Sequence, residues 1–144
     1  PLDLNNNGDI THGVFFNTGG AAVRTRLGSL GASPSAIAQV AGGTQAMTLD
    51  GGVANANNLY AVFGTFAGTT PGIPIGGGLI IPLNFPLYTN SLGFLDAQGK
   101  GAAALVLPSG LSGFAGLTIH HAFGVIDGLG NVTHISRPCG VLLY

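Results

Sequence analysis

The sequence has very few charged side chains, and it contains no glutamate and no tryptophan. Charged residues make up 6% of the 144 residues, against about 25% in a typical soluble domain. The formal net charge is −1 at pH 7, so no basic face that would attract nucleic acid and no charged patch for a membrane surface is present. We therefore expect no nucleic acid among the partners. A surface so poor in charge favours association with other copies of the same chain.

Long apolar runs and cysteine pairs are also missing. No apolar run approaches the ~20 residues of a membrane-spanning helix, so the sequence predicts no membrane span. The single cysteine, Cys139, excludes an internal disulfide. The chain begins at Pro1 and not with methionine, which we interpret as the mature product of a secreted precursor or as a fragment of a longer chain.

Helix signals are nearly absent, whereas short strand signals are frequent. The 26 glycines and 8 prolines are spread along the chain and disfavour helix interiors; only Ser33–Ala41 has the composition for a turn or two of helix. Turn residues separate the apolar stretches, which predicts a single antiparallel β-sandwich, immunoglobulin-like or jelly-roll-like. We place it at residues 35–144, after an N-terminal extension at 1–34. The expected strands are Val23–Leu27, Thr44–Leu49, Leu59–Ala67, Leu79–Leu83, Ala102–Pro108, Leu117–Asp127, Val132–Ser136 and Gly140–Tyr144.

An ordered series of motifs in the sandwich region resembles an uncharacterised family of secreted bacterial β-sandwich domains. The motifs are GTxxxTLDxG, VxGTxxGTTPG, LDAQG, LPxGL and LAGLTxHHAF, and here they lie within Gly43–Gly51, Tyr60–Gly72, Leu95–Gly99, Leu107–Leu111 and Ala115–Phe123. A further motif, LPLN…YT, lies at Ile81–Thr89; Pro86 within it, where an acid is usual, and the ending SRPCGVLLY depart from the pattern. The resemblance implies an extracellular module without known catalytic residues. It does not extend to residues 1–34.

The N-terminal stretch DLNNNGDITHG has the spacing of a calcium-binding loop. Asp3, Asn5, Asn7, Asp9 and Thr11 fall at positions 1, 3, 5, 7 and 9 of an EF-hand-type loop, with Gly8 at position 6. Position 12 is Val14, so the bidentate glutamate that normally closes the shell is missing. We expect these five residues to bind Ca²⁺ with an additional acid from Asp50, Asp96 or Asp127. The alternative is an Asn/Asp-rich turn without metal.

Candidate catalytic groups are sparse, so we expect no enzyme. No glutamate is present for acid–base pairs, and Cys139 has no neighbouring base in the sequence, which is typical of an inert buried thiol. His120 and His121 are adjacent on an expected strand and should point to opposite faces, with a core or cross-strand hydrogen-bonding role. His134, on the next strand, is expected to lie across from one of them.

The chain contains one N-x-S/T glycosylation motif, at Asn131–Thr133. It lies in the turn between two expected strands, and such a turn is solvent-exposed, as a glycosylation site requires. Asn131 is therefore a candidate attachment site for a glycan.

The extension combines the calcium-like loop with apolar segments. It has no hydrophobic core of its own in which these segments could be buried. These segments contain Val14, Phe15 and Phe16, and then Val23, Thr25 and Leu27 on one face of an expected strand. Such a strand beside a sandwich with open edges predicts strand addition between copies of the chain. Repeated head to tail, this contact builds a filament. The sequence therefore favours a structural subunit of an extracellular filament. One alternative is a calcium-stabilised binding or adhesin module, with carbohydrate as one ligand class; another is an accessory domain whose extension folds onto its own sandwich.

Overall fold

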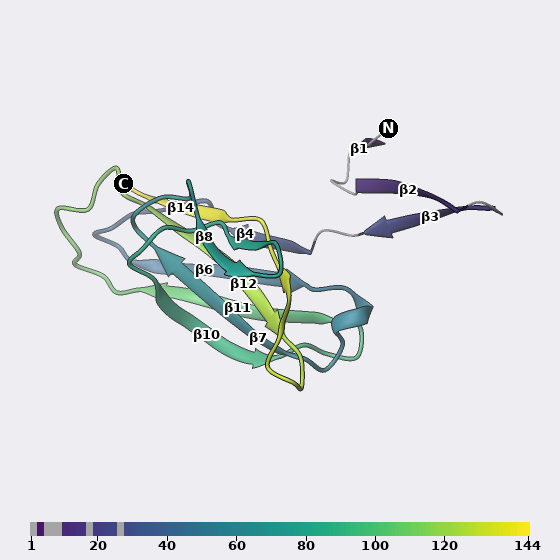
Figure 1. Ribbon diagram of the computed structural model, residues 1–144. Coiled ribbons are helices and arrows are strands. Elements are labelled where there is room, and N and C mark those ends of the chain that lie inside the picture. Colours follow the sequence, from purple (N-terminus) through teal and green to yellow (C-terminus); the bar gives the residue numbers. More distant parts are fainter. Residues whose placement is uncertain (1–2, 5–9, 17–18, 26–27) are drawn as a thin grey trace.

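The computed structural model describes residues 3–4, 10–16, 19–25 and 28–144, and these form a nearly all-β structure (Figure 1). Two antiparallel sheets pack against each other, which confirms the predicted all-β sandwich. The larger sheet has the order β10-β7-β12-β14-β5, and β13 pairs with the far end of β12. Its strands are β5 (Ala36–Ile37), β7 (Leu59–Thr65), β10 (Tyr88–Phe94), β12 (Thr118–Ile126), β13 (Val132–Ile135) and β14 (Cys139–Leu143).

The smaller sheet of the sandwich has the order β11-β6-β4. Its strands are β4 (Ser29–Ser33), β6 (Gly43–Asp50) and β11 (Lys100–Leu107). The chain passes from this sheet to the larger one between β4 and β5, where β5 pairs in parallel with β14. Together the two orders match an immunoglobulin-like sandwich, with β4, β6 and β11 facing β10, β7, β12 and β14.

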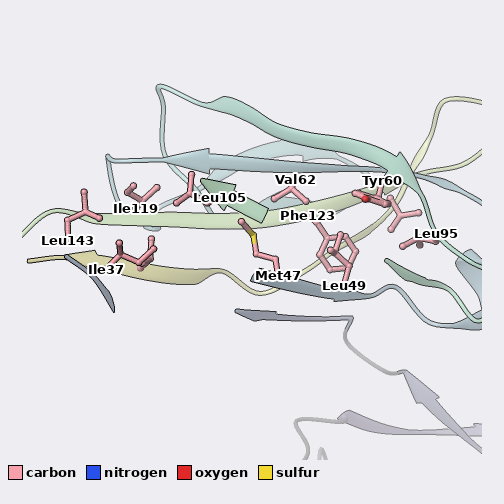
Figure 2. Close-up of a cluster of buried hydrophobic side chains, with 12 residues drawn as sticks. Ile37, Met47, Leu49, Tyr60, Val62, Leu95, Leu105, Ile119, Phe123 and Leu143 are labelled. Atoms are coloured by element: carbon pink, nitrogen blue, oxygen red, sulfur yellow. The ribbon is translucent and has the colours of Figure 1, made fainter. Parts of the chain in front are cut away.

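The core lies between these two sheets. β6 alternates strictly, with Gln45, Met47 and Leu49 buried and the residues between them exposed, because only one face of the smaller sheet is covered. Figure 2 shows that Met47 and Leu49 of β6 lie next to Tyr60, Val62 and Phe123, which belong to the larger sheet. These apolar groups supply the main burial that stabilises the fold.

The central strands of the larger sheet, β7 and β12, are buried on both faces. A short hairpin of β8 (Ile73–Gly76) and β9 (Leu79–Ile81) covers part of the outer face. There Ile81, Leu83 and Ala122 form a second apolar cluster, against which Phe63 and Ile135 pack. This double coverage explains why β7 and β12 are near-continuous apolar runs and do not alternate.

Two local expectations differ from the structure. Residues 33–41, where the sequence allowed a turn or two of helix, contain the end of β4, β5 and a turn, so that prediction is wrong; the only helical turn in the described ranges is η1 (Val53–Asn55). The sequence placed the start of the sandwich at residue 35, whereas the pairing of β4 with β6 brings Ser29–Ser33 into the smaller sheet as well. Within the described ranges, no helix has the length and apolar character that crossing a membrane requires.

The N-terminal strands form a sheet of their own. β1 (Asp3–Leu4) pairs with β2 (Ile10–Phe16), and β2 pairs with β3 (Gly19–Thr25) in an antiparallel hairpin. In the parts of the chain that the structure describes, these strands pair only with one another, and Figure 1 draws them beside the sandwich.

Candidate functional site

A row of four residues crosses the inner face of the larger sheet. Tyr88 on β10 is the register partner of Gly64 on β7, which is the partner of His121 on β12, and His121 is the partner of Cys139 on β14. The Tyr88 ring lies over Gly64, where a Cβ would overlap it. Tyr88 Oη therefore reaches His121 Nε2, at 2.8 Å, across the intervening strand. Gly64 is thus the residue that permits this cross-strand hydrogen bond.

Burial sets the protonation of this row. His121 is fully buried, and its pKa is lowered to about 4 by burial first and then by the nearby charge of His120. Burial likewise raises the pKa of Tyr88 to about 12 and that of the Cys139 thiol to about 11. At neutral pH all three groups are therefore uncharged. The thiol is in its poorly nucleophilic protonated form, in agreement with the predicted inert thiol, although Cys139 is only half-buried.

The structure confirms the predicted cross-strand hydrogen-bonding role for His121, but it places His134 elsewhere. The register partner of His134 is Val125, not His120 or His121, so the prediction that it lies across from that pair is wrong. His134 contacts the Phe123 ring, with centroids 5.6 Å apart, and a Cβ at Gly28 would overlap its imidazole. The imidazole therefore occupies the space beside Gly28, directly before β4.

Side chains bridge the two sheets along both sides of the sandwich. On one side, Tyr60 Oη donates to Ala102 O (2.7 Å) and Asn90 Nδ2 donates to Ala104 O (3.0 Å), both on the edge strand β11. On the other side, the buried Gln45 amide donates to Pro34 O (2.9 Å) and Gly140 O (3.3 Å). These donors satisfy carbonyl groups that do not bond within the sheets.

The edge strand β10 contrasts with this arrangement. Leu95 N donates to Asn58 O (3.0 Å), so the backbone of Leu95 faces β7, and strand alternation turns that of Phe94 and Leu92 away from it. In residues 28–144 no hydrogen bond is formed by these two outward-facing backbone positions. The Leu92 and Phe94 side chains are 64% and 72% exposed. β10 therefore presents a free backbone edge next to exposed apolar groups.

The acids proposed to complete a calcium shell take part in turns. Asp50 Oδ1 accepts from Gly52 N, Asp96 Oδ1 from Gln98 N and Lys100 N, and Asp127 Oδ1 from Leu129 N and Asn131 N. The bonds from Asn131 hold the pKa of Asp127 below its ordinary value. Among the described residues, no three His, Cys, Asp or Glu side chains gather at one point. Each carboxylate keeps a second oxygen that is not used in these backbone bonds.

The residues predicted for the calcium loop fall mostly outside the described ranges. Asn5, Asn7 and Asp9 lie there, as does Leu27 of the predicted intersubunit strand. Asp3 and Thr11, the first and ninth loop positions, are register partners in the β1–β2 pairing. Positions 1 and 9 of the loop are therefore opposite each other, and calcium binding stays a prediction.

The other predicted sites have clear positions along the chain. Val14, Phe15 and Phe16 lie on β2, and Val23 and Thr25 on β3 of the same hairpin, but Val14–Phe16 pair with Gly19–Ala21 and not with the second predicted segment. Asn131 is exposed at the end of the β12–β13 turn, and its Nδ2 donates to Asp127 Oδ2 (3.2 Å). Its exposure suits a glycosylated asparagine, and glycosylation stays a prediction.

Sequence reasoning missed Tyr60, Gly64, Tyr88 and Asn90, because their partners lie on other strands and no local pattern reveals them. Neither a protein-family model nor a curated protein matches this chain.

Proposed function

We propose that the protein is a structural subunit of a secreted, extracellular filament. Subunits assemble head to tail when the N-terminal extension of one copy adds a strand to the sandwich of the next. Calcium at Asp3, Asn5, Asn7, Asp9 and Thr11 then holds the extension in position.

One observation carries this proposal: in the described residues, β1–β3 pair only with one another and not with any strand of the sandwich. The extension contains consecutive large apolar residues, Val14–Phe16. Burying each of them contributes roughly 1.5–3 kcal/mol, and a neighbouring subunit supplies a surface on which to bury them. An extended segment from another chain also satisfies the free backbone of a sheet edge.

The composition supports a surface that is covered in the assembled state. With only 6% charged residues, the chain has little of the like-charge repulsion that keeps free monomers apart. The exposed apolar side chains include Phe85, Leu92, Phe94 and Val106. Association of copies removes such groups from water. A head-to-tail contact leaves one donor and one acceptor free at the two ends, so growth continues.

The calcium part of the proposal rests on the donor set and on the β1–β2 pairing. Two carboxylates, two amides and a hydroxyl at alternate positions are the oxygen ligands that Ca²⁺ prefers. The pairing of Asp3 with Thr11 brings positions 1 and 9 of the loop opposite each other. We expect an acid of the neighbouring subunit to complete the shell, because the loop lacks the usual closing glutamate.

The test compares the full chain with a deletion of residues 1–27, which keeps Gly28 and the β4–β6 pairing intact. The full chain should form regular filaments in calcium by negative-stain electron microscopy, whereas the deletion variant should form none. Removing calcium with EDTA should shorten or dissolve the filaments. Asp3→Ala should behave in calcium as the parent behaves in EDTA.

Each outcome has a distinct meaning. Regular filaments from the deletion variant would overturn the proposal. A full chain that stays monomeric in calcium, yet gains thermal stability from it and binds a glycan array, would favour the adhesin alternative. If Asp3→Ala and the parent respond equally to EDTA, the calcium loop is a turn without metal.

A further inference from the structure

We infer that β10 is the acceptor strand, and that residues Ile10–Phe16 of a second copy add to its free edge. This inference rests on the proposed function and adds to it the position of the interface.

β10 lacks two of the features by which proteins normally protect an exposed edge, although its register with β7 shifts between Thr89 and Ser91. Charged residues, especially lysine, and proline on an edge strand discourage the addition of another chain. The sequence of β10, YTNSLGF, contains neither. Its outward-facing backbone groups at Leu92 and Phe94 form no hydrogen bond within residues 28–144. An additional strand would pair with these groups.

Exposed apolar side chains gather along the same strand. Leu92 and Phe94 lie on its outer face. Near its other end, the half-exposed Phe66 ring stacks on Tyr88, with centroids 5.8 Å apart. Phe85, three residues before the strand begins, is also largely exposed. A strand lying against β10 would therefore meet apolar groups along its length.

Two other edges of the sandwich have internal partners. On β11, the carbonyl groups of Ala102 and Ala104 accept bonds from Tyr60 and Asn90, and the backbone of Lys100 bonds to Asp96. On the opposite side, the Gln45 amide donates to Gly140 O of β14 and to Pro34 O. A strand added at either place would have to displace these bonds.

The segment Ile10–Phe16 matches β10 better than the other apolar segment does. Both strands have seven residues and no Asp, Glu, Lys or Arg. β3 carries Arg24 and begins with two glycines, which have no side chain to contribute. Among the described residues, β1 pairs with β2 only at Ile10 and Thr11, and no described strand pairs with His12–Phe16 on that side of β2. The occupant is therefore β2 of a second copy.

The test uses two full-length lysine variants with matched exposure. Leu92→Lys places a charge on β10, and Val106→Lys places one on β11, where the parent side chain is 70% exposed. Leu92→Lys should raise the protein concentration needed for filaments at least about tenfold, because a charge on the acceptor edge opposes strand addition. Val106→Lys should leave that concentration within about twofold of the parent. Sedimentation and negative-stain microscopy measure both.

A second pair of variants tests the backbone contact. Phe94→Pro removes an N–H that faces away from β7, so the β7–β10 ladder keeps its bonds while the outward edge loses a donor. Phe94→Thr removes the ring but keeps that N–H. Phe94→Pro should abolish filaments and Phe94→Thr should only weaken them. Circular dichroism shows whether each variant is folded, and the lysine pair decides the question if Phe94→Pro is not.

Failure of this inference and failure of the proposed function are distinguishable. If Leu92→Lys forms filaments as readily as Val106→Lys does, β10 is not the acceptor, even when deletion of residues 1–27 still abolishes filaments. If the deletion variant itself forms filaments, the proposed function fails. Equal inhibition by both lysine substitutions would show a general effect of charge and would also overturn the inference.

Discussion

The edge strands β10 and β11 follow each other in the chain, yet their outward backbone groups differ in whether they are hydrogen-bonded. β11 begins with Lys100, and two of its carbonyl groups accept bonds from Tyr60 and Asn90. β10 has no charged residue, and its outward backbone at Leu92 and Phe94 has no partner within residues 28–144. Side chains of other strands therefore protect the edge of β11, whereas no such side chain bonds to the outward backbone of β10.

The same comparison shows how β10 is held in place. Its first residue, Tyr88, is hydrogen-bonded across Gly64 to the buried His121 on β12. At its other end, a turn leads directly to β11, where Asp96 N donates to Lys100 O (2.7 Å). β10 is thus fixed at both ends and lies against β11, while its outward backbone groups at Leu92 and Phe94 have no hydrogen-bond partner within residues 28–144. A fixed strand is a better template for strand addition than a mobile one, because less conformational entropy is lost on binding.

The largest expected effect comes from breaking the anchor of β10 with Gly64→Ala. The new Cβ would overlap the Tyr88 ring, which forces the ring to move and breaks its bond to His121. Overpacking costs about 1–3 kcal/mol, and leaving buried polar groups unpaired adds about 1–3 kcal/mol. We expect a loss of about 3 kcal/mol in the free energy of unfolding, measured with urea.

Gly128→Ala is the matched control for this variant. Gly128 lies in the β12–β13 turn, and nothing lies within 4 Å of a Cβ placed there. It should change stability by less than about 0.5 kcal/mol. Equal stability of the two variants would mean that the Tyr88–His121 contact does not hold β10.

The second expected effect is that acid weakens the Tyr88–His121 contact that anchors β10. Because the pKa of His121 is about 4 in the folded protein and about 6.5 when unfolded, the unfolded state binds more protons between these values. Stability should be full above pH 6.5 and should fall by up to roughly 3 kcal/mol as the pH drops to 4. Burial lowers the pKa of His134 in the same direction. β11, bridged by a phenol and an amide, has no imidazole in its contacts.

Urea unfolding across this pH range measures the effect. His121→Gln should be less stable at pH 7 but should lose less stability on acidification, with His134 responsible for the remainder. A pH dependence that is unchanged in His121→Gln would show that His121 does not titrate as its burial indicates.

The fold could be predicted from the sequence where burial gives a clear pattern. β6, β7, β11 and β12 all fall within or beside the expected strands, since their side chains alternate or are apolar throughout. β10 was missed because Asn90, Ser91 and Gly93 are typical of turns. In the structure, Asn90 bridges to β11, and the small Gly93 leaves room for the Tyr60 hydroxyl.

The contacts of the candidate site were predictable only in part. Adjacent histidines on a strand must point to opposite faces, which identified the alternation of His120 and His121. The partner of His121 is 33 residues away in the chain and lies two strands away, beyond a glycine, so local spacing carries no signal for it. His134 was misplaced because a register shift between Val125 and Ile126 and the length of the turn decide its partner. The calcium loop and the extension stay predictions, tested by the filament experiments.

The smallest effect should come from opening the protected edge with Tyr60→Phe. The substitution removes the hydroxyl that donates to Ala102 O and keeps the ring in the core. Losing this bond should cost about 1 kcal/mol in the free energy of unfolding. Adding Asn90→Ala, which frees Ala104 O, should make β11 resemble β10, so that the double variant associates at a lower concentration than the parent in static light scattering. If Leu92→Lys is included to block β10, this new association should persist, since it uses β11. Unchanged association of the double variant would show that the two side chains stabilise β11 without protecting its edge.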